Sequence, residues 1–199
     1  MRFGVLVSGG GSNLQAILDA RASGELDATC AVVISNKRKA GALARAERAG
    51  VPAAVIPHRR FDSREAFEDA LIDELGRHQV DWVVLAGFMR VLTPHFLAAF
   101  PARVVNIHPA LLPAFPGIDA QRQAFEYGVK VAGCTVHLVD AGTDTGPILA
   151  QRTVPVLEDD DVERLRRRIL AAEHALYPQV LQRLAAGGLT IEGRRARLG

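Results

Sequence analysis

An asparagine and a histidine two residues apart are the side chains best suited to chemistry in this sequence. Asn106 and His108 lie at the end of an apolar run over 103–107 that predicts a β-strand, and Pro109 fixes the chain directly after them. Alternation along a strand places both side chains on one face. An imidazole is the usual acid or base at neutral pH, and a side-chain amide is a neutral donor suited to an oxyanion. The pair favours an active site over an ordinary buried or surface histidine.

Asp144 is the candidate third member of this site. It lies in the glycine-rich segment GTDTG at 142–146, and a carboxylate beside an imidazole orients the ring and favours its charged form. The sequence leaves open whether Asp144 reaches His108. A metal site made of His108, His137 and a carboxylate is an alternative. No local spacing such as HxxxH supports it, and His137 on an apolar strand is more typical of a structural residue.

A glycine loop near the N-terminus predicts an anion site. Residues 5–18 read VLVSGGGSNLQAIL, in the order strand, glycine loop, helix. Glycines let backbone N–H groups approach a ligand, and the start of a helix attracts negative charge. We expect Ser12 and Asn13 to cap that helix. The alternative is a tight turn that binds nothing. A Walker A loop would need a lysine, and a dinucleotide fingerprint read from Gly9 would need glycine where Leu14 stands.

The elements that position these residues follow an α/β rhythm. Apolar runs at 3–7, 31–34, 53–56, 81–86 and 103–107 predict strands, and amphipathic stretches between them predict helices. This indicates a doubly wound, mostly parallel, Rossmann-like sheet. Beyond it we expect strands at 134–138 and 148–154, a long helix from the acidic run 158–161 to Gly187, and a mobile tail at 194–199. We expect one domain over 1–199, with a phosphate-binding half at 1–107 and a catalytic-loop half at 108–199.

Composition limits the possible classes of protein. The chain has 199 residues, a net charge of +2, and two cysteines that cannot form a disulfide framework. No apolar stretch is long enough to span a membrane, and no signal peptide is evident. We therefore expect a cytoplasmic protein. The arginines of the long helix, Arg164, Arg166, Arg167 and Arg168, are more typical of a solvated helix face than of a nucleic-acid site.

Four segments carry a resemblance to a known family. They are SGGGSNLQAI at 8–17, AGFMRVLTPHFL at 86–97, NIHPALLPAFPG at 106–117 and EHALYP at 173–178. Together they closely resemble the phosphoribosylglycinamide formyltransferases, folate-dependent enzymes of purine synthesis. The resemblance implies a formyltransferase fold, in which the half at 108–199 would also bind folate. It also implies transfer of a formyl group from 10-formyltetrahydrofolate to the amine of 5′-phosphoribosylglycinamide, with no metal or covalent cofactor.

The same resemblance assigns residues to roles. Asn106, His108 and Asp144 match the catalytic trio. The substrate phosphate would lie on Gly11, Ser12 and Asn13 with Arg64 nearby, although an arginine at a helix start is usually solvated. Glu173 would hold the ribose hydroxyls or the glycine amine end. The pterin would contact two segments, Met89, Arg90, Val91 and Leu92 in the first, and Val139, Asp140, Ala141, Gly142 and Thr143 in the second. The family varies at Asp119 and Gln121, so no folate-tail contact is assigned there.

Three related readings compete with this one. The NIHP…LLP block also occurs in methionyl-tRNA formyltransferases, which carry an additional C-terminal domain, and in formyltetrahydrofolate hydrolases, which carry an N-terminal regulatory domain. We expect neither here, since the chain has the length of the catalytic domain and keeps the GGGSN loop. A non-catalytic sensor of a phosphorylated metabolite would not need the trio. The expected partners are the two small substrates, without nucleic acid or membrane, and the expected assembly is a monomer or homodimer.

Overall fold

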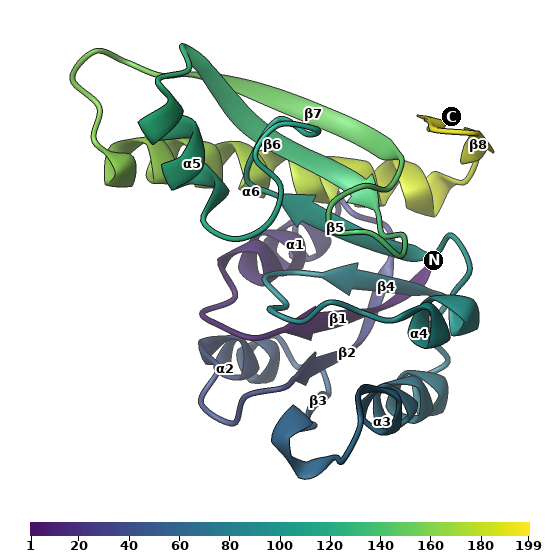
Figure 1. Cartoon of the computed structure of the whole chain (residues 1–199). Coiled ribbons are helices and arrows are strands. Elements are labelled where there is room, and N and C mark those ends of the chain that lie inside the picture. Colours follow the sequence, from purple (N-terminus) through teal and green to yellow (C-terminus); the bar gives the residue numbers. More distant parts are fainter.

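One nine-stranded sheet with helices on both faces organises the molecule, which the computed structural model describes over residues 1–199 (Figure 1). The strand order is β3-β2-β1-β4-β5-β6-β7-β9-β8. The strands are β1 (Arg2–Val7), β2 (Thr29–Ser35), β3 (Ala53–Val55), β4 (Trp82–Leu85), β5 (Val104–His108), β6 (Val131–Leu138), β7 (Ile148–Pro155), β8 (Thr190–Glu192) and β9 (Arg195–Arg197). The helices are α1 (Ser12–Ala22), α2 (Gly41–Arg48), α3 (Arg64–Arg77), α4 (Pro94–Ala99), α5 (Ala120–Tyr127) and α6 (Val162–Ala186), with a 3₁₀ turn at His58–Arg60.

The first five strands form the predicted doubly wound sheet. β3, β2, β1, β4 and β5 all pair in parallel, and the chain changes direction of travel across the sheet between β1 and β4. In open α/β sheets, ligands bind at the carboxyl ends of the strands near such a switch point. The loops after β1 and β4 therefore meet the end of β5 at one edge of the sheet, and these segments carry the glycines, Met89 and His108.

Alternation along the strands divides the core into two layers. In β4, Trp82 and Val84 face the layer that α1, α2 and α6 cover, whereas Val83 and Leu85 face the layer under α3 and α4. Strands that are apolar on both faces need helices on both faces. This is why the runs at 31–34 and 82–86 are apolar throughout instead of alternating.

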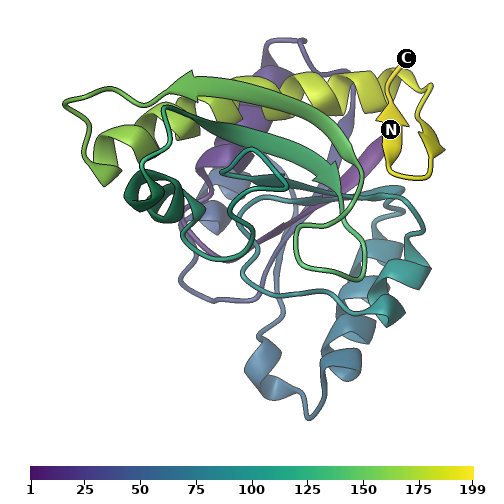
Figure 2. The ribbon, with the colours of Figure 1, turned by 45° about the horizontal axis from the view of Figure 1, so that its top comes forward.

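The second half of the sheet is covered by a helix on one face only. β6 runs antiparallel to β5, and β7 runs antiparallel to β6. Cys134, Val136 and Leu138 pack in the α6 layer, so the residues between them, Thr135 and His137, face the other way. Figure 2 shows β6 and β7 beside α6, and Phe125 of α5 packs against the same core layer as α6.

Helix α6 joins the two halves of the molecule. Its N-cap is Asp161, whose side chain accepts a hydrogen bond from the N–H of Arg164 at 2.7 Å. Near its middle, the buried hydroxyl of Tyr177 lies 3.0 Å from the carbonyl oxygens of both Leu85 and Val105. The helix thus contacts the end of β4 and the first half of β5, the strands that lead into the site. None of the helices is both long and apolar enough to cross a membrane.

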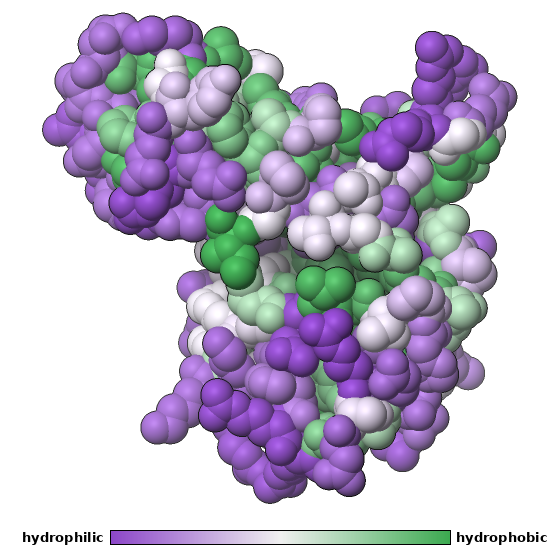
Figure 3. Space-filling model, viewed as in Figure 1, coloured by the Kyte–Doolittle hydropathy of each residue, from purple (hydrophilic) through white to green (hydrophobic).

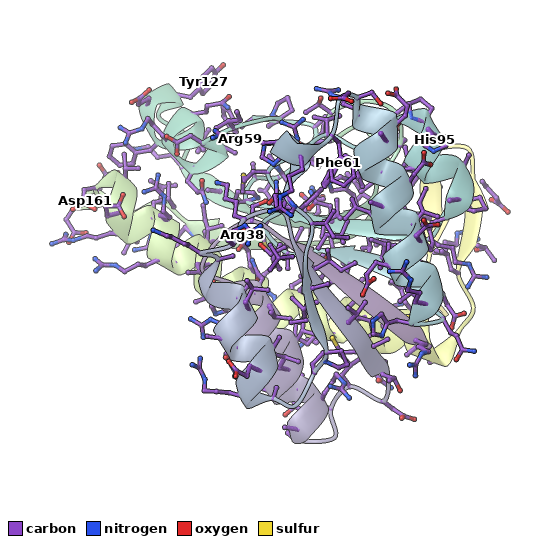
Figure 4. The ribbon with its side chains drawn as sticks, turned by 90° about the horizontal axis from the view of Figure 1, so that it is seen from below. Arg38, Arg59, Phe61, His95, Tyr127 and Asp161 are labelled. Carbon is purple, nitrogen blue, oxygen red and sulfur yellow. The ribbon has the colours of Figure 1, made fainter.

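Three local predictions were wrong or incomplete. The tail predicted to be mobile forms β9, which pairs with β8 and touches β7 at Ile148. Helix α1 is capped by Gly11 and not by Ser12 or Asn13, which are its first two residues. The short helices α4 and α5 were not predicted, because each has only one or two buried residues to give a periodic signal. Figure 4 shows His95 of α4 and Tyr127 of α5 on opposite sides of the molecule.

Candidate functional site

A cavity of about 650 Å³ opens at the carboxyl edge of β4 and β5. The segment after β4, the loop after β5, the loop between β6 and β7, and α6 all contribute to its wall. Its lining includes Asn106, His108 and Asp144 together with Met89–Leu92 and His137. In Figure 3, apolar surface gathers in the hollow between the two halves of the molecule. A cavity of this size, mostly apolar with a few convergent polar groups, is typical of a small-molecule site. A second hollow of about 570 Å³, between α2 and β3, contains none of the predicted residues.

His108 lies between two oxygen atoms. Its Nε2 is 2.8 Å from the carbonyl oxygen of Phe115, and its Nδ1 is 3.3 Å from Asp144 Oδ2. A neutral imidazole has one N–H, so only the protonated ring donates to both oxygens at once. The Phe115 carbonyl is hydrogen-bonded to Nε2, the nitrogen that points away from Asp144. A ligand that bonds to Nε2 therefore has to displace this carbonyl.

The loop that carries Asp144 folds tightly against β6. Asp144 has a φ of +56°, a left-handed conformation that aspartate tolerates better than most residues. A Cβ at Gly146 would collide with the carbonyl oxygen of Leu138, so the loop packs this closely only with glycine there. The carboxylate of Asp144 accepts a hydrogen bond from the N–H of Gly117 at 2.8 Å. Asp144 therefore links the loop after β5 to the loop after β6.

For each of His108 and Asp144, burial and neighbouring charges shift the pKa in opposite directions. Burial lowers the pKa of His108, while the Phe115 carbonyl and the Asp144 carboxylate act to raise it, and the net pKa lies below the ordinary value. Burial raises the pKa of Asp144, but the neighbouring His137 ring, the hydrogen bond from the Gly117 N–H and the charge of His108 outweigh it and lower the pKa. Near neutral pH, His108 is therefore mainly neutral beside an ionised Asp144.

His137 is a site residue that the sequence prediction missed. Its Nδ1 donates to the carbonyl oxygen of Leu138 at 2.8 Å, so in the neutral ring Nε2 carries the lone pair. The side-chain amide of Asn106 lies 3.2 Å from that Nε2 and donates to it. This fixes which way the amide points and leaves its second N–H available to a ligand. The alternation of β6, with apolar residues at 134, 136 and 138, was the signal that His137 faces the cavity.

Thr135 holds the loop that follows His108. Its hydroxyl donates to the carbonyl oxygen of Ala110 at 2.7 Å and accepts from the N–H of Leu112 at 3.0 Å. Gln151 adds donors to this hydroxyl and to the Leu112 carbonyl. Buried polar groups with all their partners in place give a defined loop conformation. The histidine is thus followed by a segment whose first residues are fixed to β6.

Most of the residues expected to contact folate line the cavity. Met89, Arg90, Val91, Leu92, Val139, Asp140, Gly142 and Thr143 do so. Ala141 is exposed and does not line the cavity. Ile118, Asp119, Gln121 and Arg166 also line the cavity. Arg166 was expected on a solvated helix face, but it bonds to Asp119 at 2.9 Å and closes the cavity on the side of α5.

The glycine loop lies at the end of β1, beside this cavity but outside its lining. Gly11 has a φ of +75°, and a Cβ there would lie 2.6 Å from the Cβ of Ala42. No side chain caps the first turn of α1, so its leading N–H groups are not occupied by a protein side chain. Free N–H groups at the positive end of a helix suit an anion. Arg64 begins α3, is exposed, and makes no hydrogen bond to this loop.

Asn13 and Glu173 meet although 160 residues separate them. The amide nitrogen of Asn13 donates to Glu173 Oε2 at 2.9 Å, and the amide oxygen of Asn13 is buried without a partner. Burial raises the pKa of Glu173 to about 7, despite the opposing hydrogen bond from Asn13. A protonated Glu173 would donate to that amide oxygen once the amide turned over. The acid therefore lies next to the glycine loop, poised between its two protonation states near neutral pH.

We expect Glu173→Gln to stabilise the protein at high pH. The folded state binds the proton of Glu173 more tightly than the unfolded state, so this group favours folding below its ordinary pKa of 4.5 and loses that effect as pH rises to about 7. Above pH 7 the folded protein carries a buried carboxylate, at a cost of about 3 kcal/mol at most. Urea unfolding should show a gain for Glu173→Gln at pH 8 and little change at pH 4.5. An equal effect at both pH values would contradict the titration of Glu173.

The structure offers no ready metal site. No group of three or more histidine, cysteine, aspartate or glutamate side chains is arranged to hold a metal ion. His108 and His137 both approach Asp144, but His137 uses its nitrogens on Leu138 and Asn106. The two cysteines are also poor ligands, since burial raises the pKa of Cys30 and Cys134 to about 12 and keeps both as thiols.

Comparison with known proteins gives matches along the chain. The formyl transferase family model matches residues 1–181. The crystal structure of glycinamide ribonucleotide transformylase 1 from Symbiobacterium toebii superposes with a TM-score of 0.97 at 56% identity, covering 100% of this chain and 93% of that one. The phosphoribosylglycinamide formyltransferase of Bacillus subtilis is 43% identical over 195 residues, which are 98% of this chain and 99% of that protein.

Longer proteins contain a similar segment. The trifunctional purine biosynthetic protein adenosine-3 of Drosophila melanogaster is 50% identical over 188 residues. Those residues are 94% of this chain but 14% of that protein, so the chain spans only a small part of such relatives. The mostly parallel sheet, its antiparallel extension and the long helix α6 all lie within the part of the structure that superposes on the Symbiobacterium enzyme.

Proposed function

The chain belongs to the formyl transferase family, and we propose that it transfers the formyl group of 10-formyltetrahydrofolate to the amine of 5′-phosphoribosylglycinamide. The products are phosphoribosyl-N-formylglycinamide and tetrahydrofolate, in de novo synthesis of IMP. The observation that carries the proposal is that Asn106, His108 and Asp144 line one largely apolar cavity. Beside it lies a glycine loop that leads into a helix without a side-chain cap. Similarity to glycinamide ribonucleotide transformylases over the whole chain supports it.

The two substrates would approach His108 from two sides. The flat pterin enters the cavity between the exposed segment Met89–Leu92 and the loop Val139–Asp144. The phosphate of the second substrate lies on Gly11, Ser12 and Asn13, and Glu173 accepts from a ribose hydroxyl or from the amine end. Arg64 supplies a cation if its long side chain bends towards the phosphate. Holding both substrates at fixed positions removes much of the entropic cost of a bimolecular step.

The chemistry needs no covalent enzyme intermediate. The amine nitrogen attacks the formyl carbon, the carbonyl double bond opens, and its oxygen becomes negatively charged. The free N–H of Asn106 and a proton on His108 stabilise this oxygen, since donors aimed at a developing oxyanion act mainly on the transition state. His137 keeps the Asn106 amide in the donating orientation. Donation by His108 Nε2 requires the Phe115 carbonyl to move away from it.

Collapse of this intermediate requires a proton transfer. The attacking nitrogen loses a proton, and the folate nitrogen gains one as its bond to the formyl carbon breaks. Asp144 is ionised, lies 3.3 Å from His108, and lines the cavity, so it can hold a water that carries the proton between the two nitrogens. The same carboxylate supports the protonated form of His108 when the oxyanion develops.

An activity assay with purified protein tests the proposal directly. The protein is mixed with phosphoribosylglycinamide and 10-formyltetrahydrofolate, and absorbance follows the loss of the formyl group from folate. Turnover that requires both substrates is expected. Release of formate without phosphoribosylglycinamide would instead indicate a hydrolase, and no reaction with either would overturn the proposal.

We expect strong chelators to leave this activity unchanged. The proposed oxyanion donors are the Asn106 amide and the His108 imidazole, which need no metal ion. Dialysis against a chelator, followed by the same assay, measures this. Loss of activity that added Zn²⁺ or Fe²⁺ restores would contradict the mechanism and return His108 and His137 to the role of metal ligands.

A further inference from the structure

The exposed lip of the cavity is held by buried polar groups at both ends. It consists of residues 87–93, in which the apolar side chains of Met89 and Val91 are 68% and 52% exposed. At the far end, Glu68 of α3 accepts from the N–H of Thr93 at 2.8 Å and from the Thr93 hydroxyl. At the near end, the anchor is a serine at the end of β1. An exposed apolar segment needs such anchors, because it has little packing of its own.

Ser8 makes the near anchor through both its backbone and its side chain. The N–H of Ser8 donates to the carbonyl oxygen of Gly87 at 3.0 Å. The N–H of Met89 donates to Ser8 Oγ at 2.9 Å, and Ser8 Oγ donates to Asn36 Oδ1 at 2.7 Å. Ser8 and Asn36 are each 3% exposed. A hydroxyl has one proton, so once Asn36 accepts it, a lone pair of Ser8 is directed to Met89.

The chain of hydrogen bonds continues from Asn36 to His58. The amide nitrogen of Asn36 lies 3.3 Å from His58 Nδ1. Burial, followed by the charges of Arg90 and Arg59, lowers the pKa of His58, so its Nδ1 carries a lone pair that accepts from the amide. This fixes the Asn36 amide with its oxygen towards Ser8. Figure 4 shows Arg38 and Arg59, which mark the loops after β2 and β3 that contain Asn36 and His58.

We propose that Ser8, oriented by Asn36, is a positioning residue that fixes the folate-contacting lip at Met89 relative to the glycine loop. The inference rests on the proposed function for the identity of the ligands. By this inference Ser8 supports the folate-contacting lip and not the phosphate site, although in the sequence Ser8 directly precedes the glycine loop. Its hydroxyl bonds to Met89 and Asn36, its N–H bonds to Gly87, and none of these hydrogen bonds reaches residues 9–13.

The glycine loop has separate anchors of its own. The N–H of Ala42 donates to the carbonyl oxygen of Gly9 at 3.2 Å, and Arg45 Nε donates to that of Gly10 at 2.8 Å. Removing the Ser8 hydroxyl leaves both contacts in place. It removes the partners of Met89 N–H and Asn36 Oδ1 in a buried setting, where an unpaired polar group is costly. The loss therefore falls on the lip and not on the phosphate site.

The test compares Ser8→Ala with wild type in the two-substrate assay. We expect KM for 10-formyltetrahydrofolate to rise about tenfold, the size of one lost buried hydrogen bond. KM for phosphoribosylglycinamide and kcat should each change less than about threefold, since neither the phosphate loop nor the trio is altered. Hydrogen exchange should show the Met89 amide about tenfold less protected in the variant, because its acceptor is gone. Ser8→Thr keeps an oxygen at this place and should restore most of both properties.

Matched variants separate positioning from general loss of stability. Ser23→Ala also removes one serine hydrogen bond, to the carbonyl oxygen of Ala20 at 3.1 Å, and should leave both KM values unchanged. If Ser8→Ala does not fold, Asn36→Ala gives the same readings, because Ser8 then loses its orienting partner. Equal rises in both KM values, or unchanged protection of the Met89 amide, would overturn the inference. An inactive wild-type protein would instead overturn the proposed function, while the exchange of the Met89 amide would still report on the anchor.

Discussion

Asn106→Ala is expected to lower kcat by about 10²–10³-fold, the typical loss when one oxyanion donor is removed. His108→Ala should cost at least as much, because it removes a donor and the group that manages a proton. Asp144→Asn removes the charge 3.3 Å from His108 Nδ1. All three changes act mainly on the transition state, so both substrates should still bind. Steady-state kinetics, with separate binding titrations for each substrate, measure the two effects.

The double variant tests whether these residues act as a unit. Groups that act together are strongly non-additive, so His108→Ala combined with Asp144→Asn should be little worse than the poorer single variant. His137→Gln is a useful comparison. It keeps a group able to accept from Asn106 but removes the imidazole, and a small loss would show that orienting the amide is its main task. Near wild-type turnover in Asp144→Asn, or double-variant losses that simply multiply, would exclude Asp144 from the unit.

The sequence predicted the parallel half of the fold well, for a physical reason. Strands buried on both faces are apolar throughout, and the helices between them show a clear period, as at Phe67, Leu71 and Leu75. The short helices and the C-terminal strands were predicted less completely. α4 buries only Phe96, and β9 forms through pairing with β8 and not through an apolar pattern. Elements held by pairing or capping give little signal in hydrophobic periodicity.

The candidate site was likewise predicted only in part from the sequence. The location of Asn106 and His108 on one face followed from strand alternation, and the structure brings Asp144 to them. The roles of His137, Thr135 and Arg166 did not follow, because each depends on contacts across the chain. His137 needs the register of β5 and β6, which pairs it with Asn106. Arg166 needs the loop at Asp119 to fold back towards α6. Such pairings are properties of the tertiary structure and are invisible to local patterns.

Gly11→Ala is expected to raise KM for phosphoribosylglycinamide by about 10²-fold. The added Cβ would lie 2.6 Å from the Cβ of Ala42, so the loop has to shift away from α2 and carry the first N–H groups of α1 with it. Those N–H groups are the proposed phosphate ligands, and an anion site at a helix start depends on their direction. The folate cavity has no lining residue in the glycine loop, so KM for 10-formyltetrahydrofolate should change less than about threefold.

Gly24→Ala is the matched control for this prediction. Gly24 also has a positive φ, +82°, but a Cβ there would meet no atom within 4 Å. Both variants therefore pay the strain of a left-handed alanine, roughly 1 kcal/mol, whereas only Gly11→Ala displaces the loop. Comparing the two in unfolding and in two-substrate kinetics separates strain from displacement. If Gly11→Ala changes both KM values equally, or changes them no more than Gly24→Ala does, the glycine loop is a structural turn and the phosphate binds elsewhere.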